Sequence, residues 1–218
     1  CWLVASRVPI LMSALAGPQR VKPTPVRKSG FNHGAWMIYG AYGYTGELIA
    51  REAARRGWTP ILAGRDPAKV QAIAAELGLA HRAFGLEDDA TVRQNLQGVA
   101  LVLHCAGPFS ATARPMLDAC LQAGSHYLDI TGEIDVLEDT LGRGAAARQA
   151  GIVVCPAVGF DVIPTDCVAA ALKSALPDAT HLALGFDSRS GLSSGTTKTT
   201  IEGAARGGRV REEGRLRV

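Results

Sequence analysis

Residues 36–46 read Trp36-Met37-Ile38-Tyr39-Gly40-Ala41-Tyr42-Gly43-Tyr44-Thr45-Gly46. The first four residues form a short apolar run that is typical of a buried strand, and glycines stop it. The glycines have Gly-x-x-Gly-x-x-Gly spacing and come directly before a segment with helical periodicity. This stretch therefore predicts a glycine-rich turn between a strand and a helix.

Strand-like and helix-like segments alternate after this turn. Strands are expected at 60–63, 81–84, 99–104, 126–129 and 152–155. Helices are expected at 45–56, from Asp66-Pro67 to residue 77, and at 88–97, 112–123, 138–150 and 165–175. This alternation is typical of βαβ crossovers, so we predict an α/β fold with a Rossmann-like, doubly wound parallel sheet.

Two details of these helices are specific enough to test. In the helix at 45–56, the spacing of Leu48, Ile49 and Ala53 predicts one buried face. Asp66 before Pro67 is a strong start signal, because Asp caps helices and Pro fits their first position.

The chain divides into three parts by composition. Residues 1–34 hold five cations and no acid, and we expect an unstructured basic leader there. Three alternatives stay open for it: a mis-set start, an export signal ending near Ala16, or an organelle transit segment. Residues 35–176 are the expected Rossmann domain. Residues 177–218, with a strand at 181–186, are expected to begin a truncated second α+β domain.

Composition excludes several classes of function. The 218 residues carry 23 basic and 20 acidic side chains, a net charge of +3 that is too small to favour nucleic acid as a partner. No apolar run reaches the length of a membrane-spanning helix. The five cysteines form no Cys-x-x-Cys pair, which favours a reducing, cytoplasmic location. No metal site is expected, and the expected partner is a small-molecule substrate.

The glycine spacing suits a dinucleotide pyrophosphate. Such a site needs a tight turn, close approach of the backbone, and helix N–H groups directed at the anion. We assign the turn to Gly40, the close approach to Gly43 and the packing of helix on strand to Gly46, with the Thr45 hydroxyl as a further donor. The residues predicted to hold the pyrophosphate are Gly40, Ala41, Gly43, Tyr44, Thr45 and Gly46.

The end of the second strand bears on the choice of cofactor. NAD sites usually place an acid there for the ribose hydroxyls, whereas this strand ends in Ala63-Gly64-Arg65. A guanidinium can bind a 2′-phosphate, so we predict NADP, with NAD as the less favoured alternative. Asp66 is the rival residue for NAD, but as a helix cap its carboxylate is already engaged. A solvated surface cation is the other interpretation of Arg65.

Later strand ends supply the remaining candidates. We expect Ala106, Gly107 and Pro108 to flank the nicotinamide, with His104 as a core or rim histidine and Cys105 as a structural thiol. The catalytic candidates are acids that follow the strands at 126–129 and 152–155, namely Asp129, Glu133 and Asp161, with Asp166 beside them. Each of these acids can instead cap a helix, as Asp166 would at the helix near 165–175. The Tyr-x-x-x-Lys, Gly-x-Ser-x-Gly and His-Glu-x-x-His motifs are absent.

Together, the motifs at 36–46, 63–65, 104–109, 127–133 and 159–161 resemble those of the saccharopine dehydrogenase NADP-binding domain group, which includes saccharopine dehydrogenase-like oxidoreductases and trans-acting enoyl reductases. The resemblance extends over about residues 36–202. It implies an NAD(P)H-dependent oxidoreductase that transfers hydride between nicotinamide and a C=C, imine or carbonyl group. It also implies a second domain that shapes the substrate site and often forms a homodimer. The alternative is a non-catalytic NADP-binding sensor or a truncated nucleotide-binding module.

Overall fold

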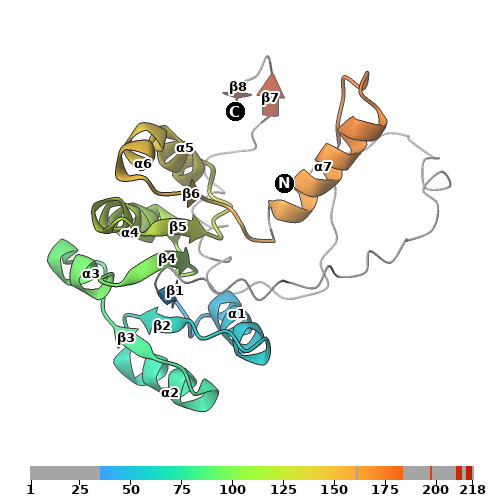
Figure 1. Cartoon of the computed structure of the whole chain (residues 1–218). Helices are drawn as coiled ribbons and strands as arrows, with labels where there is room; N and C mark the ends of the chain where they lie inside the picture. Colours follow the sequence, from blue (N-terminus) through green and yellow to red (C-terminus); the bar gives the residue numbers. More distant parts are fainter. Residues whose placement is uncertain (1–34, 161, 184–196, 198–209, 213–214, 218) are drawn as a thin grey trace.

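The structure is a computed structural model that describes residues 35–160, 162–183, 197, 210–212 and 215–217. Its strands are β1 (Ala35–Tyr39), β2 (Ile61–Gly64), β3 (His81–Ala83), β4 (Val99–His104), β5 (His126–Asp129), β6 (Val154–Cys155), β7 (Val210–Glu212) and β8 (Arg215–Arg217). Its helices are α1 (Tyr44–Arg55), α2 (Pro67–Leu77), α3 (Asp89–Asn95), α4 (Phe109–Ala123), α5 (Ile134–Gly142), α6 (Gly144–Ala150) and α7 (Ile163–Ala175). Figure 1 shows their arrangement.

The described residues form a six-stranded sheet in the order β3-β2-β1-β4-β5-β6, and all of its pairs are parallel. β1 and β4 are adjacent, although two strands separate them in the sequence. The strand order therefore reverses between β1 and β4, and in open α/β sheets ligands bind beyond the carboxyl ends of the strands at this point. The predicted Rossmann-like α/β fold is confirmed.

Helices cover both faces of the sheet, which explains why its strands are apolar on both sides. Ile38 and Leu62 pack with α1 and α2 residues in one buried cluster. Met37 and Tyr39, which alternate with Ile38 along β1, belong to a larger cluster with residues of α3 and α4. The two clusters position the carboxyl ends of β1, β2, β4 and β5 along one edge.

Most element boundaries agree with the sequence. The strands at 99–104 and 126–129 are confirmed at both ends, and Asp66 caps α2 by accepting a hydrogen bond of 3.2 Å from the N–H of Lys69. The predicted helix at 138–150 is wrong: α5 and α6 occupy this region and meet at Arg143. The Arg143 side chain forms ion pairs with Asp118 of α4 and Asp139 of α5, which fix this junction against α4.

Two expectations about helical side chains need correction. The buried face predicted for α1 is confirmed for Ala53, and Ile49 packs against a buried cluster, but Leu48 is 53% exposed. The other buried residues of α1 are Gly46 and Ala50. Asp166 does not cap α7, because this helix begins earlier, at Ile163, and places Asp166 in its first turn.

The chain beyond the sheet is less closely packed. α7 has no buried residue and stands apart from the sheet layers in Figure 1. Residues 181–183 do not form the expected strand, and the rest of that segment lies outside the described residues, as does the predicted leader. None of the helices in the described part of the chain combines the length and hydropathy needed to cross a bilayer. The domain boundaries after residues 34 and 176 stay predictions.

Candidate functional site

The turn between β1 and α1 is as tight as its glycines indicate. Gly40 has a φ of +85°, in the left-handed region, and a Cβ there would lie 2.8 Å from the backbone nitrogen of Ala106. A Cβ on Gly46 would overlap the carbonyl oxygen of Gly40. The N–H of Gly43 donates to that same oxygen at 3.0 Å. The three glycines thus allow the loop to fold back onto itself and against the end of β4.

The turn is also fastened to β2. The N–H groups of Gly40 and Ala41 donate to the carbonyl oxygen of Ala63 at 2.8 and 3.1 Å, and Ala41 is fully buried. These bonds continue the β1–β2 pairing beyond Tyr39. The loop backbone is therefore held in place before any ligand binds.

The amino end of α1 is open. Its cap residue, Gly43, has no side chain to satisfy the first helical N–H groups, and the first backbone bond of the helix runs from Glu47 to Gly43 at 2.8 Å. Within residues 35–160, no hydrogen bond engages the N–H groups of Tyr44, Thr45 or Gly46. Unsatisfied N–H groups at a helix start attract anions, and the helix dipole adds to this attraction.

At the end of β2, Arg65 is exposed and makes no ion pair or hydrogen bond with the described residues. Asp66 differs from it, because its Oδ1 atom accepts from the Lys69 N–H and its Oδ2 atom lies 3.6 Å from Lys69 Nζ. The expectation that Asp66 is engaged as a cap is confirmed. Of the two rival residues, the cation has its hydrogen-bonding groups available.

The turn after β4 is held by a buried network that the sequence did not suggest. The Thr112 hydroxyl lies 2.6 Å from the carbonyl oxygen of Ala106 and 3.0 Å from that of Pro108. His104 Nε2 lies 3.0 Å from the same hydroxyl. Because the single hydroxyl proton goes to a carbonyl, the histidine must donate, which assigns the proton to Nε2. No motif in the sequence indicated this contact between His104 and Thr112.

His104 is a core histidine, one of the two alternatives that the sequence left open. It is fully buried between the rings of Tyr39 and Phe109, and its Nδ1 atom has no hydrogen-bond partner among the described residues. Burial lowers the pKa of His104 to about 3, so the ring is neutral. Burial also raises the pKa of the Cys105 thiol to about 12, which agrees with a structural thiol.

Glu133 is engaged at the start of α4. Its Oε1 accepts from the N–H of Phe109 at 2.9 Å, and its Oε2 accepts from the N–H of Ser110 at 2.7 Å. A carboxylate at this position satisfies two unpaired donors and complements the helix dipole. The structure thus gives Glu133 a structural task at the turn that carries Ala106, Gly107 and Pro108.

Asp129 is fully buried, and both of its carboxylate oxygens are engaged. Oδ1 accepts from the N–H groups of Thr131 (3.0 Å) and Ala157 (2.9 Å), and Oδ2 accepts from the Tyr127 hydroxyl (2.8 Å). Burial, together with the charge of Asp129, raises the pKa of Tyr127. These contacts fit a structural acid better than a proton relay, because both oxygens already accept hydrogen bonds, Oδ1 from two donors and Oδ2 from one.

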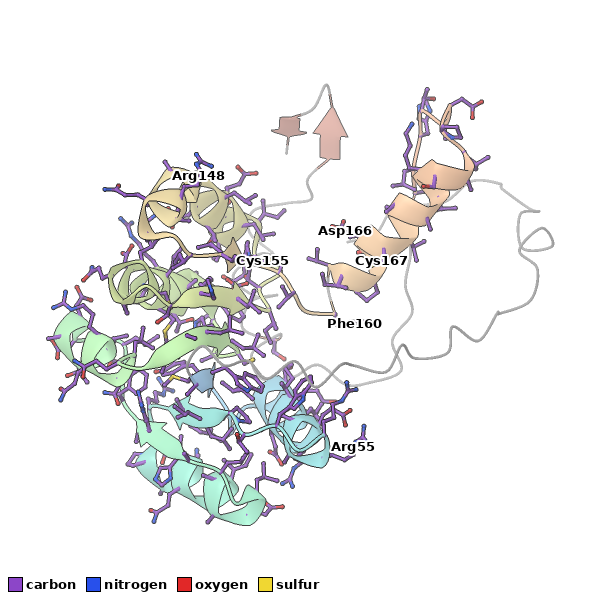
Figure 2. All side chains as sticks on the ribbon, in the orientation of Figure 1. Arg55, Arg148, Cys155, Phe160, Asp166 and Cys167 are labelled. Atoms are coloured by element: carbon purple, nitrogen blue, oxygen red, sulfur yellow. The ribbon has the colours of Figure 1, made fainter. Side chains whose placement is uncertain are left out.

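The remaining acids are less informative. Asp161 lies outside the described residues. Asp166 lies on α7, close along the chain to Cys167 and beyond the exposed Phe160 (Figure 2). No group of three or more His, Cys, Asp or Glu side chains within the described ranges is arranged to hold a metal ion.

Comparison with known proteins agrees with this geometry. The model of the saccharopine dehydrogenase NADP-binding domain family matches residues 36–155. A Mycobacterium tuberculosis protein that carries the name of a trans-acting enoyl reductase is 31% identical over 182 residues, which cover 76% of this chain and 43% of that protein. A human saccharopine dehydrogenase-like oxidoreductase is 29% identical over 150 residues, which cover 60% of this chain and 35% of the human protein.

A solved structure has the same fold. Apo saccharopine dehydrogenase (L-Glu forming) from Saccharomyces cerevisiae superposes with a TM-score of 0.56 at 16% identity, over 65% of this chain and 31% of that one. The chain spans less than half the length of the two curated relatives. The family match itself covers residues 36–155, which is more than half of this chain.

Proposed function

Since the chain belongs to the saccharopine dehydrogenase NADP-binding domain family, a family of NADP-dependent oxidoreductases, we propose that it binds NADP(H) at the carboxyl edge of β1, β2 and β4. The observation that carries the proposal is the open start of α1, where the N–H groups of Tyr44, Thr45 and Gly46 have no acceptor within residues 35–160. The glycines let the loop fold tightly against the start of α1, and Gly43 at the cap position carries no side chain that would block the helical N–H groups, so the residues present fit a pyrophosphate.

Three parts of the cofactor would lie beyond the carboxyl ends of three different strands, β1, β2 and β4. Gly40, Ala41, Gly43, Tyr44, Thr45 and Gly46 would hold the pyrophosphate. Arg65 would bind the 2′-phosphate through its free guanidinium. Ala106, Gly107 and Pro108 would face the nicotinamide, at the turn that Thr112 and Glu133 hold.

The bound nicotinamide would supply hydride transfer to or from a C=C, imine or carbonyl group of a small molecule. The names of the relatives favour a C=C substrate of an enoyl reductase or an imine substrate of the saccharopine type. This chain's own residues would orient the cofactor rather than move the substrate proton, because Asp129 and Glu133 are engaged. We assign any proton transfer to Asp161 or to residues beyond those described. We also propose that the protein lies in the cytoplasm and that it forms a homodimer through its second domain.

The test is calorimetric titration with NADPH and NADH, with Arg65→Asp and Asp66→Asn as matched variants. Arg65→Asp should weaken NADPH binding by about 1–3 kcal/mol more than NADH binding, the range for charge-assisted hydrogen bonds. Asp66→Asn keeps a capping side chain and removes a nearby negative charge, so NADPH affinity should not fall. Equal losses for both nucleotides in Arg65→Asp, or a selective loss of NADH binding in Asp66→Asn, would favour an NAD site.

Assays with C=C, imine and carbonyl acceptors then separate an enzyme from a sensor. Oxidation of NADPH by any acceptor supports the oxidoreductase. Tight NADPH binding with no oxidation across the whole panel supports the non-catalytic sensor.

A further inference from the structure

Tyr42, the side chain between the first two glycines of the loop, rests on the end of β2. A Cβ added to Gly64 would lie 2.6 Å from Cε1 of Tyr42 and 3.2 Å from Cγ2 of Val70. Only glycine at position 64 leaves space for the ring. Arg65, the residue proposed to bind the 2′-phosphate, directly follows Gly64 along the chain.

Lys69 reaches the same place from the first turn of α2. Its Nζ atom lies 5.7 Å from the centroid of the Tyr42 ring, within the range of a cation–π interaction. Its counter-ion is Asp66, at 3.6 Å, and the Lys69 side chain remains 66% exposed. The Tyr42 ring thus attracts the Lys69 ammonium, which remains accessible to a ligand.

We propose that Lys69 is a second cation for the adenosine 2′-phosphate, and that Tyr42 is a positioning residue that holds it next to Arg65. This inference rests on the proposed NADP site and adds the residues that set its preference for NADP(H) over NAD(H). A phosphomonoester has three acceptor oxygens, and a guanidinium engages two of them in a bidentate pair. The Lys69 ammonium, near the Tyr42 ring, would supply a further donor as a point charge.

Asp66 is the counter-ion of Lys69 and also the cap of α2. With no ligand, its carboxylate offsets the Lys69 charge while its other oxygen caps α2. A dianionic phosphate would attract the ammonium more strongly than the single charge of the Asp66 carboxylate does. The Asp66 cap stays in place, because the bond to the Lys69 backbone does not involve the ammonium.

The direct test is calorimetric titration of the full chain with NADPH, NADH and 2′,5′-ADP. Lys69→Gln should weaken NADPH and 2′,5′-ADP roughly 5- to 20-fold, as expected for loss of a charge-assisted bond at an exposed site, and should change NADH less than twofold. Lys173→Gln on α7 is the matched control, because within the described part of the chain this lysine bonds only to the carbonyl oxygen of Pro177. Its affinity for all three ligands should equal that of the wild type.

Tyr42 variants test the positioning role. Tyr42→Phe keeps the ring face and should retain the NADPH preference, whereas Tyr42→Leu keeps bulk without the ring and should lower it about 2- to 5-fold. If the wild type binds NADPH and Lys69→Gln keeps the same preference for NADPH over NADH, the role of Lys69 is overturned. The proposed NADP site would still stand in that case. Failure of the wild type to bind any of the three ligands would overturn both proposals.

Discussion

The carboxylate of Asp129 accepts a hydrogen bond of 2.9 Å from the backbone N–H of Ala157, a non-glycine residue with a φ of +59°. A left-handed conformation costs an alanine about 1–2 kcal/mol, so something must hold it there. The backbone oxygen of Asp129 adds a second tie by accepting from Val158 at 2.8 Å. Asp129 therefore fixes the chain where it leaves the sheet toward α7.

Replacing Asp129 should lower the free energy of unfolding, because its carboxylate holds the fold together and is not proposed to act in catalysis. In Asp129→Ala, the N–H groups of Thr131 and Ala157 and the Tyr127 hydroxyl lose their acceptor, so the free energy of unfolding should fall by about 3 kcal/mol or more. Asp129→Asn keeps one acceptor oxygen and should lose about half as much. Urea denaturation measures both. An Asp129→Ala protein with wild-type stability but no hydride transfer would instead identify Asp129 as catalytic.

Glu133 should behave as a helix cap. Glu133→Ala should lower the free energy of unfolding by about 1–2 kcal/mol, because Phe109 and Ser110 lose a charged acceptor at the start of α4. NADPH affinity should fall with it, since this turn is proposed to flank the nicotinamide. The exposed Glu138, on α5, provides the control Glu138→Ala, which should change neither quantity. Full stability of Glu133→Ala would contradict the capping role.

The buried His104 should make stability depend on pH. Its folded-state pKa is lowered to about 3, so the native ring stays neutral while the unfolded chain takes up a proton below about pH 6.5. Its contribution is complete above pH 6.5 and is lost as the pH falls toward 3, with a slope of at most about 1.4 kcal/mol per pH unit.

Urea melts between pH 5.5 and 6.5 isolate this slope. Carboxylates such as Glu52, whose ordinary pKa of 4.5 is lowered in the folded protein, are mostly ionised in both the folded and the unfolded state across this window. The slope should be smaller in His104→Gln and unchanged in His81→Gln, which removes an exposed histidine. Equal slopes in the wild type and His104→Gln would show that the ring titrates normally in the native state.

Two glycines allow strain and clash to be separated. Gly57 has a φ of +73° with nothing within 4 Å of an added Cβ, so Gly57→Ala should cost only the conformational strain of about 1 kcal/mol. Gly40→Ala has the same strain and also presses on Ala106, so it should cost more and should weaken NADPH binding at least about tenfold. Thermal unfolding and titration measure the two effects. Equal costs at both positions would mean that the loop moves away freely.

The sequence predicts the elements well where the local signal is strong. The apolar run at 99–104 and the Asp66-Pro67 start are found as expected, because both depend on neighbours within a few residues. The helix at 138–150 fails because an alanine-rich segment keeps helical periodicity across a break. That break is fixed by Arg143 and its ion pair with Asp118, 25 residues away.

By itself, the sequence determined the alternation of strands and helices, the glycine turn and the cation that follows β2. All of these depend on spacing along the chain and on the conformations that glycine, proline and aspartate allow. Only the tertiary structure decided what the acids do. Asp129 and Ala157 lie 28 residues apart, and Glu133 and Phe109 lie 24 apart, so the partners that engage these carboxylates meet only when the sheet assembles.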